Sequence, residues 1–233
     1  MRFVCLASDY DGTLAEDGVV PKSTVAALQR VKESGRKIVL VTGREVADLR
    51  SVFPELGIFD RVIAENGAVL LGEEGQQERT LAKAPPIELT EELRRRSVPI
   101  FVGKSIVATW RPHEKDVRDA IRELRLDVEV ALNKNAVMIL PKGVTKASGL
   151  RQALGELKIS AESVVGVGDA ENDEDFLAIC GMSVAVANAL PELKSKVMHV
   201  TKADHGAGVE ELIAELLAND LSERLPAAAP RSH

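Results

Sequence analysis

Short apolar runs that end in polar residues recur along the chain, and they predict buried strands. Residues 3–8 form one such run and residues 37–41 form a second. Between them, residues 21–34 repeat apolar side chains at helical spacing, with a proline at the start and a glycine after the end. Because proline often opens a helix and glycine often closes one, these three segments predict a βαβ unit with parallel strands.

Further segments of both kinds extend the βαβ unit into an open sheet. Apolar runs at residues 61–64, 163–167 and 182–186 predict more buried strands, and residues 146–157 and 209–217 have helical spacing. Strands that alternate with helices are typical of a parallel sheet covered by helices. We therefore predict an α/β fold whose main domain is a Rossmann-like parallel-sheet core.

Residues 81–142 follow a different pattern and predict a smaller α+β domain inserted into the core. The predicted order is helix, strand pair, helix and strand pair, at residues 86–96, 100–102 and 105–110, 114–124, and 128–132 and 136–140. Lys104 and residues 133–135 occupy the two expected hairpin turns, although only the second has typical turn residues. The insert divides the core into residues 1–80 and 143–220.

The composition fits a globular protein with a substantial core and excludes some classes of partner. The 233 residues are 45% hydrophobic and 28% charged, which excludes disorder of the whole chain. The formal net charge is -6, and only 3% of the residues are aromatic. A nucleic-acid partner is not expected, because such binding needs a basic surface and, for single strands, aromatic stacking.

The sequence contains no sign of a membrane segment or of a disulfide framework. No apolar run approaches the ~18 residues of a membrane span, and the run from Phe3 ends at Asp9, too early for a signal peptide. Cys5 and Cys180 lie in apolar surroundings, which predicts buried, reduced thiols. We expect a cytoplasmic protein with no membrane partner. Residues 221–233 are expected to form a flexible tail, because their last part shows no periodic pattern.

Acidic clusters follow two of the predicted strands. Residues 9–11 contain two aspartates, and residues 169–175 contain five acids. Ligands of open α/β sheets bind beyond the carboxyl ends of the strands, where these acids would lie. The acids would repel one another unless a cation compensates their charge. For either cluster alone, a structural explanation is as good as a functional site: the acids could be turn residues, or they could lie in the first turn of a helix.

Two other motifs fit these clusters poorly. An EF-hand loop that began at Asp9 or Asp169 would lack both the glycine and the final glutamate that it needs. Gly166 and Gly168 resemble the start of a dinucleotide-binding fingerprint, but Glu171 occupies the third glycine position. The chain contains no P-loop pattern either, so nucleotide binding by these motifs is not expected.

Two further polar features suit the binding of a phosphoryl group. Thr42 and Gly43 end the second strand, where a hydroxyl and backbone amides can bind a phosphate oxygen. Lys146 opens the helix after the insert, although a lone lysine in that place is more often solvated. Carboxylates, hydroxyl and lysine are together the groups that phosphoryl transfer to a carboxylate nucleophile needs.

The sequence resembles the haloacid dehalogenase superfamily of phosphotransferases. The four motifs that carry this resemblance occur in order, as Asp-Tyr-Asp-Gly-Thr-Leu at 9–14, Val-Thr-Gly-Arg at 41–44, Lys146, and Gly-Asp-Ala-Glu-Asn-Asp at 168–173. Glu-Asn-Gly at 65–67, the place of the insert and the form of the fourth motif resemble the Cof-like branch. That branch includes sugar-phosphate, sucrose-phosphate and small phosphoglycolate phosphatases. The resemblance covers nearly the whole chain, and it implies that the insert is a cap domain.

The resemblance implies a phosphatase that hydrolyses a small phosphorylated metabolite through an aspartyl-phosphate. Asp9 would be the nucleophile, and Asp11 would be the general acid and base. Thr42, Gly43 and Lys146 would hold the phosphoryl group. The insert is shorter than the cap usual in the Cof-like branch, which favours phosphoglycolate over the larger sugar phosphates.

The same resemblance implies a Mg²⁺ cofactor. Asp9, the backbone carbonyl of Asp11 and Asp169 would be its ligands, and Asn172 and Asp173 would support the site. Hard oxygen ligands suit Mg²⁺. A metal and a lysine would also offset the repulsion between a carboxylate and a phosphate dianion.

Substrate contacts from the cap are less explicit in the sequence. The polar residues near its predicted strand ends are Lys104, Arg111, His113, Asn133 and Lys134, and for each of them taken alone a solvated surface position is the more common explanation. We choose Arg111 as the contact to an anionic leaving group, because a guanidinium can bind a carboxylate with two hydrogen bonds.

Two other functions are compatible with parts of this pattern. A phosphomutase of the same superfamily would return the phosphoryl group to its substrate instead of passing it to water. A receiver-like signalling domain also phosphorylates an aspartate at a strand end. Such a domain needs neither an acid/base two residues after its acceptor nor a cap, so Asp11 and the insert disfavour it.

Overall fold

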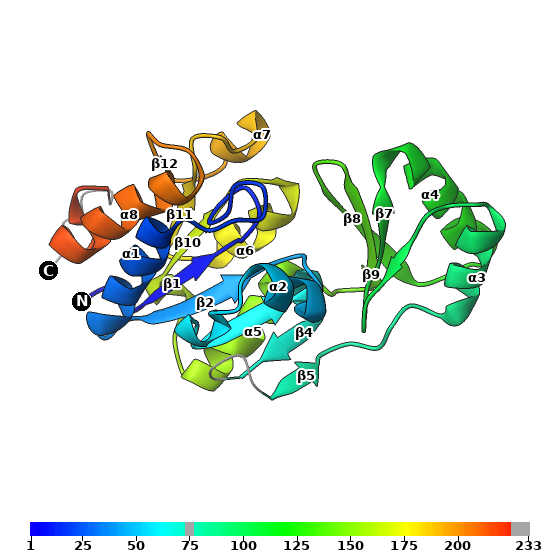
Figure 1. Cartoon of the computed structure of the whole chain (residues 1–233), viewed down its shortest axis with the longest axis horizontal. Coiled ribbons are helices and arrows are strands. Elements are labelled where there is room, and N and C mark those ends of the chain that lie inside the picture. The colour runs from blue at the N-terminus through cyan, green and yellow to red at the C-terminus, as the bar shows by residue number, and fades with distance from the viewer. Residues whose placement is uncertain (73–76, 225–233) are drawn as a thin grey trace, which may run out of the picture.

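The computed structural model describes residues 1–72 and 77–224, whose strands form two separate sheets (Figure 1). The larger sheet has eight strands in the spatial order β12 (His199–Val200), β11 (Met182–Ala185), β10 (Val164–Gly168), β1 (Cys5–Ser8), β2 (Lys37–Val41), β3 (Arg61–Ala64), β4 (Val69–Leu71) and β5 (Glu78–Thr80). Neighbouring strands from β12 to β3 are parallel, whereas β4 and β5 pair antiparallel at one edge. The predicted Rossmann-like parallel core is confirmed.

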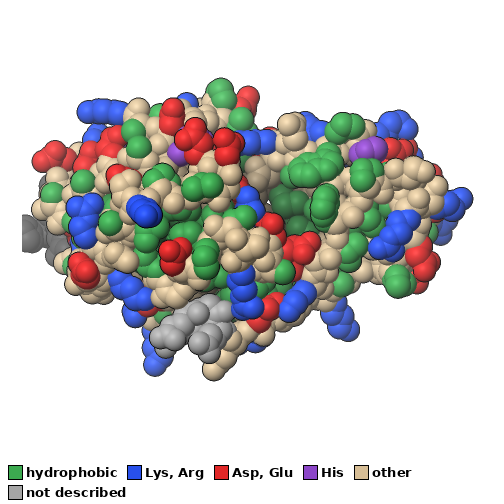
Figure 2. Space-filling view, in the orientation of Figure 1, with side chains coloured by type: hydrophobic (Ala, Val, Ile, Leu, Met, Phe, Trp, Pro, Cys, Tyr) green, Lys and Arg blue, Asp and Glu red, His purple; other side chains and the backbone are tan. Residues whose placement is uncertain are grey.

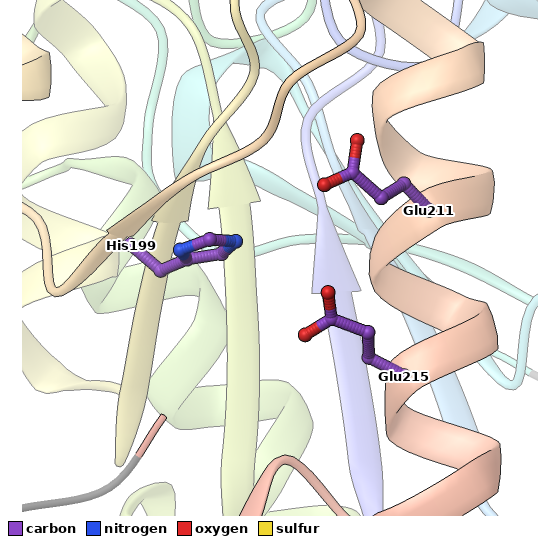
Figure 3. Close-up of side chains that lie close together, drawn as sticks. All are labelled: His199, Glu211 and Glu215. Carbon is purple, nitrogen blue, oxygen red and sulfur yellow. The ribbon is translucent and has the colours of Figure 1, made fainter. Parts of the chain in front are cut away.

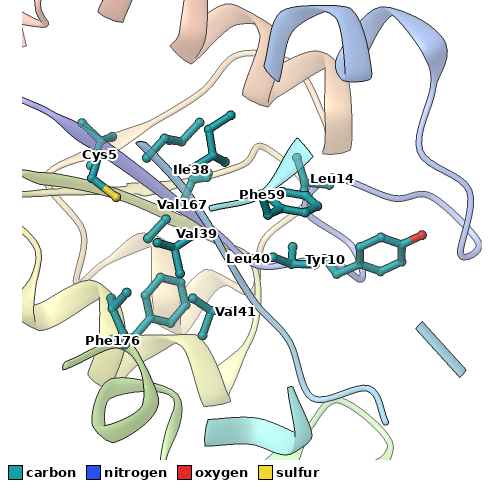
Figure 4. Close-up of a cluster of buried hydrophobic side chains, with 14 of the residues drawn as sticks. Cys5, Tyr10, Leu14, Ile38, Val39, Leu40, Val41, Phe59, Val167 and Phe176 are labelled. Atoms are coloured by element: carbon teal, nitrogen blue, oxygen red, sulfur yellow. The ribbon is translucent and has the colours of Figure 1, made fainter. Parts of the chain in front are cut away.

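Helices cover both faces of this sheet. They are α1 (Lys22–Glu33), α2 (Val46–Val52), α5 (Lys146–Leu157), α6 (Glu174–Ile179), α7 (Pro191–Lys194) and α8 (His205–Asn219). α1 contacts α8 on one face, and α5 contacts α6 on the other (Figures 1 and 4). The strands between them are buried on both sides, which explains why β1, β2 and β10 are almost continuous apolar runs.

The core between these layers is formed by aliphatic and aromatic side chains, as Figure 4 shows for Ile38, Val39, Val167 and Phe176. Cys5 belongs to the same cluster, and it and Cys180 are buried and free, as predicted. Burial raises the pKa of the Cys180 thiol to about 12, so it stays protonated at neutral pH.

The second sheet is antiparallel and lies in the inserted segment. Its spatial order is β6 (Phe101–Val102), β7 (Val107–Trp110), β9 (Ala136–Pro141) and β8 (Val128–Asn133). One face packs on α3 (Ile87–Arg95) and α4 (Glu114–Glu123), through apolar residues such as Val107, Val137 and Ile139. Because side chains alternate along a strand, the intervening residues point to the other face, toward the larger sheet (Figure 1). This is the predicted α+β unit.

Several short elements were not predicted. The strands β4, β5 and β12 have two or three residues each, and α2, α6 and α7 have at most seven. β5 has the polar sequence Glu-Arg-Thr and lies at the sheet edge. Such elements lack the length over which a periodic pattern can be recognised, and pairing with β3 holds β4 in place.

The predicted flexible tail begins too early. Leu221 is only 1% exposed and belongs to the main core, and Arg224 forms an ion pair with Glu215 at 2.8 Å. Residues 221–224 are therefore part of the folded domain, and the rest of the predicted tail lies outside the described residues. Within the described ranges, no helix has the length and hydropathy needed to cross a bilayer.

Candidate active site

Strand ends of the larger sheet bring the predicted site residues together. Asp9 follows β1, Thr42 follows β2 and Asp169 follows β10, and these three strands are neighbours in the sheet. All three residues are buried, with at most 3% of their surface exposed. Neighbouring parallel strands place their carboxyl ends at one edge, so residues far apart in the sequence converge there.

Lys146 lies inside this acidic cluster. Its side chain is fully buried, and Nζ lies 2.6 Å from Asp9 Oδ1 and 2.5 Å from Asp173 Oδ1. Thr145 caps the helix that begins at Lys146, because its hydroxyl accepts from the backbone N–H of Ser148 at 3.2 Å. Burial alone would lower the pKa of Lys146, but Asp173 and Asp9 outweigh that effect and raise it above its usual value. Lys146 is therefore expected to carry a positive charge at neutral pH, paired with two carboxylates.

The carboxylates around Lys146 carry more negative charge than one ammonium compensates. Burial and the neighbouring Asp173 raise the pKa of Asp9 and also that of Asp169. Asp9, Asp169 and Asp173 each offer an oxygen, and these oxygens lie within 4.8 Å of one another. Asp173 is already engaged, because its Oδ2 accepts from the backbone N–H groups of Asp169 at 2.8 Å and Ala170 at 3.0 Å.

This donor set fits a hard divalent cation. The three buried carboxylates supply oxygen ligands, and a cation would relieve their mutual repulsion. Asn172 supplies a further buried oxygen, because its Oδ1 has no hydrogen-bond partner among the described residues. The Asn172 amide group is held from the other side, where Nδ2 donates to Asn66 Oδ1 at 2.9 Å.

Asp11 lies at the wall of the site and is held by a residue to which the sequence assigned no role. Arg44 donates from Nε and Nη2 to the two Asp11 oxygens at 2.8 and 2.7 Å, and from Nη1 to Asp48 at 2.6 Å. The hydrogen bond with Asp11 is the main cause that raises the pKa of Arg44. Arg44 belongs to the Val-Thr-Gly-Arg segment, but only the fold reveals that its partner is Asp11.

A cavity of about 820 Å³ separates these groups from the second sheet. Asp9, Asp11 and Arg44 are among the residues that line it from the larger sheet, and Phe101 and Trp110 are among those from the second sheet. Figure 2 shows hydrophobic side chains around the hollow between the two lobes. Asp9 of the acidic cluster thus faces this cavity, opposite a wall that belongs to the insert.

Comparison with known proteins supports the resemblance to the haloacid dehalogenase superfamily. The haloacid dehalogenase-like hydrolase family model matches residues 6–115 and 114–213. The chain belongs to this family. It is 32% identical over 222 residues to the phosphoglycolate phosphatase of Methanothermobacter thermautotrophicus, and this alignment covers 91% of the chain and 98% of the relative.

Solved structures of haloacid dehalogenase proteins have the same fold. A HAD/COF-like hydrolase candidate from Plasmodium vivax aligns with a TM-score of 0.79 at 22% identity and covers 95% of this chain and 97% of its own. A sugar phosphatase of HAD subclass IIB aligns with a TM-score of 0.75 at 22% identity, with coverage of 91% and 98%. At this identity the structures show the fold alone, including the second α+β unit.

These findings confirm the predicted superfamily, the fold class and the assignment as a phosphatase of the haloacid dehalogenase type. They contradict the receiver-like signalling domain, because the family match extends over most of the chain. The structure also brings the predicted residues Asp9, Asp11, Thr42, Lys146 and Asp169 to one end of the sheet. Gly43 lines the cavity.

Two of the five candidate cap residues of this haloacid dehalogenase-like hydrolase, Asn133 and Lys134, line the cavity. Lys104, Arg111 and His113 are not among its lining residues. Lys104 instead pairs with Glu78, and His113 lies 3.8 Å from Asp116. The choice of Arg111 is therefore wrong, because its Nε donates to the Lys134 carbonyl at 2.6 Å instead of facing the cavity.

The larger domain of this hydrolase contains a second group of possible metal ligands, the partly buried His199, Glu211 and Glu215 (Figure 3). Interactions within the protein already engage the two acids. Arg224 donates to both Glu215 oxygens at 2.8 and 2.9 Å, and Glu211 accepts from the backbone N–H of Lys202 at 3.0 Å. These contacts tie the end of the described chain and the loop before α8 to that helix.

Proposed function

We propose that this chain is a cytoplasmic, Mg²⁺-dependent phosphatase that hydrolyses a small phosphorylated metabolite of the phosphoglycolate kind. The observation that carries the proposal is the buried Lys146 ammonium between Asp9 and Asp173, next to a cavity that Asp9 lines. A lysine beside a carboxylate nucleophile reduces the repulsion that an approaching phosphate dianion would meet. The name of the Methanothermobacter relative supports phosphoglycolate as the first substrate to test.

In the first step, an Asp9 oxygen attacks the phosphorus atom and forms an aspartyl-phosphate. The bond between phosphorus and the leaving oxygen breaks, and Asp11 donates a proton to that oxygen. Lys146, the Thr42 hydroxyl and the backbone of Gly43 hold the phosphoryl oxygens. In the structure Arg44 holds the Asp11 carboxylate at the cavity wall through its two hydrogen bonds. Before the transfer, one Asp11 oxygen leaves Arg44 and takes up the proton that it then gives to the leaving oxygen.

In the second step, Asp11 takes a proton from a water molecule whose oxygen attacks the same phosphorus atom. The bond between phosphorus and the Asp9 oxygen breaks, which releases inorganic phosphate and restores the Asp9 carboxylate. The leaving group and the water approach from the cavity, so one residue at the wall can serve both steps.

Asp9, Asp169 and the backbone carbonyl of Asp11 would hold the Mg²⁺ ion, with Asn172 and Asp173 as supporting residues. When bound, the ion would supply positive charge that stabilises the transferring phosphoryl group. Asp173 supports the site by fixing the backbone of Asp169 and by orienting Lys146.

The experiment compares the wild type with Asp9→Asn, which has the same shape but no anionic nucleophile. We expect Mg²⁺-dependent release of inorganic phosphate from phosphoglycolate by the wild type and less than about 1% of that rate in the variant. Asp9→Asn that retained more than a few per cent of the rate would contradict the covalent mechanism. With a hexose phosphate, which has further hydroxyl groups, a product isomer formed without net phosphate release would instead identify a phosphomutase.

A further inference from the structure

The turn between β8 and β9 carries Lys134 from the second sheet to the acidic cluster. Asn133 pairs with Ala136, so Lys134 and Asn135 form the tip of a tight hairpin. Lys134 Nζ lies 2.5 Å from Asp169 Oδ2. The Lys134 side chain is 43% exposed, whereas that of Asp169 is 1% exposed, so Lys134 covers Asp169 from the cavity side.

Contacts of the Lys134 backbone hold the turn independently of the Lys134 side chain. The Lys134 N–H donates to Glu171 Oε2 at 2.9 Å, and the Lys134 carbonyl accepts from Arg111 Nε at 2.6 Å. Arg111 Nη2 in turn lies 3.4 Å from Glu171 Oε1. The ammonium can therefore exchange its partner while the turn stays in place over the site.

Charge is distributed unevenly around the cavity. The larger sheet contributes acids, and its lining arginine, Arg44, is already paired with Asp11 and Asp48. Among the described lining residues, Lys134 is the only lysine or arginine from the insert. An anionic group on a substrate would meet repulsion from the acids on the side of the larger sheet and attraction from the Lys134 ammonium on the side of the insert.

Much of the remaining wall from the insert is apolar, which suits a small leaving group. Phe101, Ala108, Trp110 and Met138 present apolar surface there, and the Phe101 and Trp110 rings contact each other edge to face. Hydroxyl groups of a sugar that lay against this apolar part would lose water without gaining a hydrogen-bond partner, whereas the uncharged polar side chains of the insert wall are Thr109, Asn133 and Asn135. A short leaving group with one anionic end needs only one polar contact.

We propose that Lys134 is the residue that selects an anionic leaving group, by moving its ammonium from Asp169 to a carboxylate on that group. The inference rests on the proposed function and specifies the substrate class of the same site. A cation bound by Asp9 and Asp169 would compensate the Asp169 charge and so release Lys134 for the substrate. Lys134 thereby links cation binding at the acidic cluster to recognition of the anionic leaving group.

The first experiment compares phosphoglycolate with ethyl phosphate, which has a methyl group in place of the carboxylate. We expect Lys134→Met to lower the ratio of kcat/KM for phosphoglycolate to that for ethyl phosphate by about 10-fold or more, the scale of one charge-assisted hydrogen bond. Lys134→Arg should retain most of this ratio because it keeps the charge. Lys104→Met is the matched control, since Lys104 lies in the other hairpin turn and does not line the cavity.

The outcomes separate this inference from the proposed function. An unchanged ratio in Lys134→Met, or an equal change in Lys104→Met, would overturn the role of Lys134 while leaving the phosphatase intact. A wild type that hydrolyses neither substrate would overturn the proposed function and this inference together. A wild type that hydrolyses both equally well would overturn the inference alone.

The second experiment measures Mg²⁺ binding by calorimetry in the absence of substrate. Removal of an ammonium 2.5 Å from Asp169 should strengthen Mg²⁺ binding, by about 3-fold or more in Lys134→Met, because the two positive charges compete. Lys134→Arg should bind Mg²⁺ as the wild type does. Equal affinities in the wild type and Lys134→Met would show that Lys134 does not engage Asp169 in solution, and would overturn the proposed exchange.

Discussion

At the scale of single residues, the balance of acidic and basic groups determines the properties of the site. Asp9, Asp169 and Asp173 contribute three buried carboxylates, and Lys146 and Lys134 contribute two ammonium groups. A fully buried charge is tolerated only when it is paired, so each lysine also supports the fold. The three carboxylates outnumber the two ammonium groups, and this excess negative charge favours the binding of a cation.

The first prediction concerns the stability of Asp9→Asn. The variant removes one of three crowded carboxylates and leaves Lys146 paired with Asp173, so the free energy of unfolding should stay the same or rise at pH 7. Activity should be lost in the same protein. Urea unfolding of both proteins without metal measures this, and a clear loss of stability would mean that the Asp9 ion pair outweighs the repulsion.

The second prediction concerns Arg44. Arg44→Lys keeps the charge but loses the paired hydrogen bonds to Asp11, so kcat should fall by about 10-fold because the acid/base is no longer oriented. Asp48→Asn is the control, since it removes the other partner of Arg44 and leaves the Asp11 contacts. Steady-state kinetics on one phosphoester suffice. A loss of similar size in both variants would argue against a specific role of Arg44 in orienting Asp11.

At the scale of elements, two glutamates of the larger domain hold the two hairpin turns of the insert. Glu65 is buried and accepts from the backbone N–H groups of Lys104 at 3.0 Å and Ser105 at 2.7 Å. Glu171 accepts from Lys134 in the other turn. A carboxylate that accepts from backbone N–H groups fixes the position of a turn without depending on the side chains of that turn.

The third prediction compares these two contacts. Glu65→Gln should destabilise the protein by about 1–3 kcal/mol, because it weakens two charge-assisted hydrogen bonds in a buried place. Glu171→Gln should have a smaller effect, since the Glu171 side chain is partly exposed. Hydrogen exchange at Lys104 and Ser105 should accelerate only in the first variant. Equal exchange in both variants would contradict the assigned role of Glu65.

The fourth prediction concerns a glycine that lets α5 approach the turn after β3. Gly67 has φ of +112°, and a Cβ there would lie 2.0 Å from the Thr145 carbonyl oxygen, next to Lys146. Gly67→Ala should therefore be strongly destabilising and reduce activity. Gly143→Ala has a positive φ of +76° but no atom within 4 Å, so it should lose only about 1–2 kcal/mol from backbone strain. Urea unfolding distinguishes the two, and similar losses would mean that crowding is unimportant.

At the scale of the whole molecule, the substrate space lies between two sheets with separate cores. The groups assigned to the phosphoryl transfer belong to the larger sheet, and the wall opposite belongs to the smaller one. This arrangement lets the leaving-group contacts vary without disturbing the reacting groups. Stability and cation binding are linked through the same acidic cluster.

The fifth prediction follows from that linkage. A cation that binds the folded chain and not the unfolded one raises the melting temperature, so Mg²⁺ should raise the Tm and a chelator should abolish phosphate release. Asp169→Asn should reduce the Mg²⁺-dependent rise in Tm, because it replaces a buried ligand. A Tm that is independent of Mg²⁺ in the wild type would contradict a Mg²⁺ site at the acidic cluster.

The sequence by itself determined the elements whose pattern is local. β2 and α5 begin and end where the apolar periodicity predicts them, because a buried strand and a two-faced helix each leave their pattern in consecutive residues. The motif residues Asp9, Asp11, Thr42, Lys146 and Asp169 were also recognisable, since each lies at the end or start of such an element.

Only the tertiary structure decided which side chains meet. Arg44 and Asp11 are 33 residues apart, Glu65 and Ser105 are 40 apart, and Lys134 and Asp169 are 35 apart. None of these pairs has a local signature, because an ion pair or a turn contact requires only that two distant segments converge. Arg111 shows the same limit, since its sequence suited a substrate contact, yet the fold turned it toward the Lys134 carbonyl. Local patterns determine the elements, and long-range packing determines the partners of each charge.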